Sequence, residues 1–76
     1  MSSLSQISWQ EFEKFLKFIG CTFLREKGDH RVWGRVGLKR PVVIPKIKMI
    51  PAFVIRNNLR LLGITTAEYL DIATKL

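Results

Sequence analysis

The spacing of apolar residues along this 76-residue chain changes from a helical period to an alternating one and then back again. Before Gly20 and after Pro51, apolar residues recur every three or four positions, which is typical of amphipathic helices. Between these segments, short runs rich in β-branched and aromatic residues are separated by glycine and proline, which is typical of strands. A short chain with this pattern is expected to bury the apolar stripes of its helices against one small sheet.

The first helix is predicted over residues 9–19. Ser8 and Glu11 fit a capping box, in which Ser8 caps the helix and the Glu11 side chain reaches back to it. Gly20 then supplies the left-handed residue that commonly ends a helix. The stripe expected in the core consists of Phe12, Phe15, Leu16 and Ile19.

Three short strands are predicted over residues 22–27, 30–36 and 41–45. Gly28-Asp29 is a turn signal between the first two, and Gly37 marks a second turn. Pro41 and Pro45 bracket the third run, which suits an edge strand. The simplest connection is an antiparallel meander.

Alternation along the second strand separates its side chains into two sets. One face carries His30, Val32, Gly34 and Val36, and the other carries Arg31, Trp33 and Arg35. Trp33 is therefore either a core residue or an aromatic platform for a nucleobase, since two arginines share its face.

Two helices are predicted after the sheet. Pro51 suits the first turn of a helix that ends at Gly63, and Thr65 and Glu68 form a capping box for a short last helix. Phe53 is the other aromatic candidate for base stacking, but a rim contact between helix and sheet is the favoured interpretation of this residue. The element order is α-β-β-β-α-α, so the predicted fold class is α+β: a small three-stranded antiparallel sheet with helices on one face, in one domain over residues 1–76.

The charge of the chain is strongly basic, with 13 Lys and Arg against six Asp and Glu and a formal net charge of +7. Eight of the basic residues lie between Arg25 and Lys48. A local basic patch of this kind predicts a polyanionic partner, either nucleic acid or an acidic protein. For an average basic domain, a merely solvated sheet face is about as good an explanation.

Composition also excludes several classes of protein. One cysteine and one histidine cannot build a disulfide framework or a zinc site, which favours a reducing, cytoplasmic location. No apolar run approaches the ~18 residues of a membrane span, and residues 1–10 lack the pattern of a signal peptide. The scattered carboxylates disfavour a two-metal nuclease, so neither metal nor cofactor is expected.

His30 is the only histidine and directly follows the Gly28-Asp29 turn. A lone histidine is more often a surface or packing residue, but here it adjoins a tight turn among several cations. RNA supplies its own nucleophile, the 2′-hydroxyl, so one imidazole with cations suffices in principle to cleave it. His30 is the catalytic candidate, and the candidate phosphate-binding residues are Lys27, Gly28, Arg31, Arg35 and Arg40.

Four stretches, residues 20–23, 25–31, 43–45 and 55–65, resemble the HicA (YcfA-like) toxins of type II toxin–antitoxin systems. The resemblance implies a fold like that of double-stranded-RNA-binding domains, ribonuclease activity on mRNA, and a HicB-type antitoxin partner. The family's catalytic histidine closes a Gly-Ser/Thr-His motif, which maps onto His30. Asp29 stands where the family has a hydroxyl residue, and its carboxylate would either hold a charged imidazole or repel phosphate.

Three functions follow from these features. The leading hypothesis is a metal-independent endoribonuclease toxin that acts through His30. The alternative is a non-catalytic RNA-binding module on the same fold, although the helix after Pro51 does not open with the lysine cluster of double-stranded-RNA readers. The third is an interaction protein whose basic face binds only an acidic antitoxin.

Overall fold

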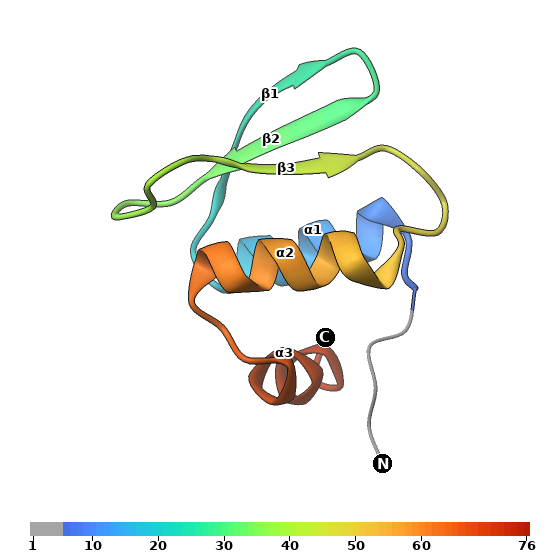
Figure 1. Ribbon diagram of the computed structural model, residues 1–76, viewed down its shortest axis with the longest axis vertical. Coiled ribbons are helices and arrows are strands. Elements are labelled where there is room, and N and C mark those ends of the chain that lie inside the picture. The colour runs from blue at the N-terminus through green and yellow to red at the C-terminus, as the bar shows by residue number, and fades with distance from the viewer. Residues whose placement is uncertain (1–5) are drawn as a thin grey trace.

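The structure, a computed structural model, describes residues 6–76, so residues 1–5 of the segment tested for a signal peptide lie outside it. Six elements follow one another along the chain (Figure 1): α1 (Trp9–Phe18), β1 (Thr22–Lys27), β2 (His30–Gly34), β3 (Val42–Pro45), α2 (Ala52–Leu62) and α3 (Thr66–Ala73). This order confirms the predicted α+β fold class.

The strands form an antiparallel meander with β2 in the centre, and β3 is an edge strand as predicted. The turn at Gly28-Asp29 pairs Lys27 of β1 with His30 of β2, and Pro45 of β3 pairs with His30 from the other side. In β1, a β-bulge interrupts the regular pairing with β2 after Phe23. Residues before and after the bulge therefore do not follow one strict alternation between the two faces of the sheet.

The helices all lie on one side of the sheet. Helices α1 and α2 cover one sheet face, and α3 lies beneath them, on the side away from the strands (Figure 1). Tyr69 of α3 reaches between these layers, with its ring centroid 4.8 Å from that of Phe15 and 6.1 Å from that of Phe12. The opposite sheet face carries no helix among residues 6–76.

The caps of the helices follow the sequence signals closely. Thr65 and Glu68 form both bonds of the predicted capping box, and Gly63 ends α2 in the left-handed conformation. At α1, the Glu11 backbone N–H donates to Ser8 Oγ at 3.2 Å, but the Glu11 carboxylate pairs with Lys14 Nζ at 3.1 Å. The reciprocal half of the first predicted capping box was therefore wrong.

One further prediction was wrong. Strand β2 ends at Gly34, two residues before Val36, because Arg35 turns toward the helices and donates to the carbonyl oxygens of Ile19 and Leu62. The Phe53 side chain on α2 is 59% exposed, so any contact that it makes at the rim leaves most of its ring open. Cys21, the only cysteine, is a free thiol buried in the core, where it packs as a small apolar residue.

Candidate functional site

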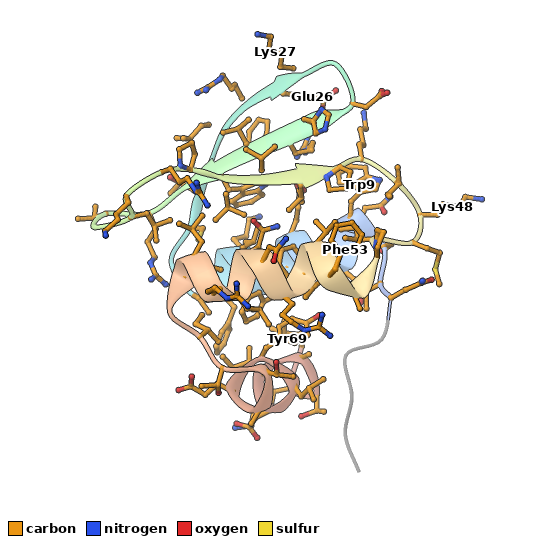
Figure 2. The ribbon with its side chains drawn as sticks, in the orientation of Figure 1. Trp9, Glu26, Lys27, Lys48, Phe53 and Tyr69 are labelled. Carbon is orange, nitrogen blue, oxygen red and sulfur yellow. The ribbon has the colours of Figure 1, made fainter. Side chains whose placement is uncertain are left out.

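The open face of the sheet presents the only histidine of the chain. His30 is exposed at the start of β2, directly opposite Lys27, and alternation puts it on the face away from the helices. Figure 2 shows Lys27 at the end of the sheet, pointing away from the helices. A shallow depression of about 540 Å³ on this face is bordered by Arg25, Lys27, Gly28, Asp29 and His30, over a floor of Val32 and Val43.

The turn that carries His30 is tied to the rest of the sheet. Gly28 has a φ of +58°, a conformation that L side chains rarely adopt, which explains glycine at the tightest point of the turn. The Lys46 N–H donates to the Asp29 carbonyl oxygen at 2.7 Å, and Lys46 Nζ lies 3.3 Å from a Glu26 carboxylate oxygen. These two contacts join the turn and the end of β1 to Lys46, the residue that follows β3.

Arg31 points to the opposite face of the sheet from His30. Its Nε donates to Glu13 at 2.6 Å and its Nη1 to Glu26 at 2.9 Å. Its guanidinium carbon lies 4.2 Å from the ring centroid of Phe23. The hydrogen bonds that Arg31 donates to Glu13, and next the one to Glu26, raise the pKa of Arg31, so the guanidinium stays charged.

Glu13 completes this cluster from α1. Its carboxylate accepts hydrogen bonds from Arg31 and from Trp33 Nε1, the latter at 2.7 Å. Trp33 is 4% exposed and belongs to the core, which decides between the two interpretations of this residue. The hydrogen bonds from Arg31, and then from Lys46, lower the pKa of Glu26 and keep that carboxylate ionised as well.

The remaining candidate arginines also lie apart from His30. Arg35 binds carbonyl oxygens at the ends of α1 and α2. Arg40 lies with Gly34 beside a different depression, at the far end of β2. At ~3.3 Å per residue, that end is about 13 Å along the strand from His30.

Of the predicted phosphate-binding residues, the structure thus brings Lys27 and Gly28 to His30 and places Arg31, Arg35 and Arg40 elsewhere. It adds Arg25, which sequence reasoning had not singled out. The signal was available: a two-residue turn pairs Lys27 with His30, and Arg25 precedes Lys27 by two positions on the same strand.

Two absences concern the described part of the chain. Within residues 6–76, no three side chains of His, Cys, Asp or Glu type converge in a way that could hold a metal ion. In the same residues, no helix has the length and apolarity needed to traverse a bilayer.

The fold and site define a class: a small α+β protein whose open sheet face presents one histidine among cations. Residues 9–64 match a family described as "HicA toxin of bacterial toxin-antitoxin". The chain therefore belongs to the HicA toxin family, and this membership implies a toxin–antitoxin system with an antitoxin partner. No curated protein and no solved structure gives a significant match to the chain.

Proposed function

We propose that this HicA-family protein is a metal-independent endoribonuclease that cleaves mRNA, with His30 as its catalytic residue. The observation that carries the proposal is the exposed imidazole of His30, opposite Lys27 on a sheet face that no helix covers among residues 6–76. The toxin would act as one domain, residues 1–76, in the cytoplasm, where its substrate is found. A HicB-type antitoxin would inhibit it.

The chemistry needs one proton acceptor close to a ribose. Neutral His30 accepts the proton of the 2′-hydroxyl, and the 2′-oxygen forms a bond to the adjacent phosphorus as the bond to the 5′-oxygen breaks. The leaving 5′-oxygen takes a proton from water, and the proton held by His30 returns to the hydroxide so formed, which restores the neutral imidazole. The other product carries a 2′,3′-cyclic phosphate. Lys27 and Arg25 would stabilise the extra negative charge on the phosphate oxygens in the transition state.

The proposal retains only Lys27 and Gly28 of the phosphate-binding residues predicted from sequence. Lys27 and the Gly28 backbone border the same depression as His30, whereas the Arg31 guanidinium is already bound by two carboxylates. The side chains around the depression also support a mechanism without a metal ion, because they offer few metal ligands. Asp29 is the one carboxylate that borders the depression, and Glu26 is held by cations.

The proposal is tested by comparing the wild-type protein and His30→Ala on a mixed-sequence RNA, with and without EDTA. We expect the variant to cleave about 10² to 10⁴-fold more slowly while its RNA affinity is retained, because a general acid or base contributes that much to rate. Lys27→Ala should also reduce cleavage, whereas Lys39→Ala, a matched change beside another depression, should not.

Several results would contradict the proposal. Cleavage by His30→Ala at the wild-type rate would remove His30 from the mechanism, and inhibition by EDTA would indicate a metal. Cleavage of an oligonucleotide whose 2′-hydroxyls are replaced by hydrogen would exclude attack by the 2′-oxygen. RNA binding without turnover by the wild type would make the chain a non-catalytic RNA-binding module.

A further inference from the structure

A second hollow lies between α1 and the β1 edge of the sheet, on the side opposite His30. This recess has a volume of about 390 Å³, near the lower end of the ~300–1,000 Å³ typical of small-ligand sites. Both tryptophans of the chain line it. The other lining residues that matter here are Glu13, Lys14, Lys17, Phe23 and Arg31.

The charged side chains at the floor of the recess are already paired with one another. Glu13 accepts from Arg31 and Trp33, so its carboxylate oxygens already have partners within the cluster, one of them a cation. The Arg31 guanidinium stacks against Phe23 at 4.2 Å and lies 5.0 Å from the Trp9 ring centroid. The cluster therefore needs no further ion and presents a mainly aromatic surface to an incoming group.

The rim of the recess has the opposite character. Lys17 is exposed on α1, and Lys14 makes only an exposed pair with Glu11, of the kind that contributes little to stability. Phe23 is 43% exposed although it lies in a strand. Aromatic rings that remain partly open beside lysines are the combination that binds single-stranded nucleic acid, since bases stack on the rings and phosphates pair with the cations.

From these observations we infer that the recess binds a nucleobase of single-stranded RNA, stacked on Phe23, with the neighbouring phosphate at Lys17. This inference rests on the proposed function, because it extends the substrate bound at His30. Phe23, Arg25 and Lys27 belong to one edge strand, and the latter two border the depression beside His30. One RNA strand that crosses the β1 edge would reach both sites.

The test measures binding separately from cleavage. A short single-stranded RNA in which every 2′-hydroxyl is methylated cannot be cleaved by the proposed mechanism, so it reports affinity alone. Because Trp9 and Trp33 line the recess, a base stacked there should quench the intrinsic tryptophan fluorescence. We expect Phe23→Ala to weaken binding of this RNA by about 5- to 150-fold, the loss of one base–aromatic stack.

Three further variants distinguish stacking from a structural effect. Phe23→Tyr keeps the aromatic ring and should retain the affinity. Phe18→Ala removes an even more exposed phenylalanine from α1, outside the recess, and should leave the affinity unchanged. Lys17→Gln should reduce the salt slope of log Kd by about 0.7, the value of one single-strand phosphate contact.

The outcomes separate this inference from the proposed function. Wild-type affinity and quenching in Phe23→Ala would overturn the inference, and His30-dependent cleavage by that same variant would leave the proposed function standing. Weakened RNA binding by Phe23→Ala with no cleavage by the wild type would support the recess and refute the catalytic proposal. If Phe23→Ala weakened binding of the antitoxin but not of RNA, the recess would be a protein interface and the inference wrong.

Discussion

Replacement of Glu13 by glutamine should cost this small protein a large share of its stability. The Glu13 side chain is 14% exposed and accepts from Arg31 Nε at 2.6 Å, Arg31 Nη2 at 3.0 Å and Trp33 Nε1 at 2.7 Å. Glutamine keeps one oxygen acceptor, loses the charge and turns an amide N–H₂ toward groups that can only donate. At least one buried donor is therefore left without a partner.

The magnitude follows from these contacts. Hydrogen bonds to charged groups contribute ~1.5–3 kcal/mol, and an unsatisfied buried donor costs a similar amount. Arg31 keeps its bond to Glu26 and is one-fifth exposed, which moderates the loss. We expect the free energy of unfolding to fall by about 2–3 kcal/mol. For a domain of this size the Tm should then drop by about 8–24 °C, at 4–8 °C per kcal/mol.

The matched control is Glu11→Gln, the same change two residues earlier in the same helix. Glu11 pairs only with Lys14, and both side chains are more than half exposed, so the loss should stay below about 1 kcal/mol. Thermal and urea unfolding followed by circular dichroism measure both variants. Equal Tm values for Glu11→Gln and Glu13→Gln would refute the idea that the buried cluster stabilises the contact between α1 and the sheet.

Three further predictions concern titration and backbone. Burial, and then the charge of Glu11, raise the pKa of Tyr69, the only tyrosine, so this contribution to stability is full below pH ~10 and is lost as pH rises through the folded pKa. Tyrosinate absorbance should therefore titrate at higher pH in the native protein than in urea. The lowered pKa of Glu26 acts in the other direction: its contribution is present above about pH 4.3 and is lost as pH falls through the folded pKa, so the Tm of Glu26→Gln should change less than that of the wild type between about pH 5 and 3. Gly63→Ala should lower the Tm by about 4–8 °C, because a φ of +73° costs an L residue about 1 kcal/mol.

Much of the fold could be predicted because its signals are local. The Thr65–Glu68 box, the left-handed Gly63 and the two-residue turn before His30 each depend on residues a few positions apart. Strand β2 was overextended because its end depends on Arg35, whose partners, Ile19 and Leu62, are 16 and 27 residues away. Contacts between residues so far apart in the sequence produce no local or periodic pattern from which they could be predicted.

The site was predictable to a smaller extent. The alternation of side chains along β2 already places Arg31 and His30 on opposite faces of the sheet. The predicted site nevertheless treats the two residues as parts of one cationic surface. Glu13 lies off the apolar stripe of α1 and therefore resembles a solvated residue, but in the fold it is the partner of Arg31 and Trp33.

The sequence by itself determined the order of the elements, their caps, and the turn that sets Lys27 opposite His30. Only the tertiary structure decided which face of the sheet the helices cover. Both faces of β2 mix apolar and polar residues, so the hydrophobic patterning of this strand alone does not distinguish them. The covered face buries Trp33, Val42 and Ile44 in the core, and there a carboxylate from α1 satisfies Arg31 and Trp33 together, which leaves the His30 face open.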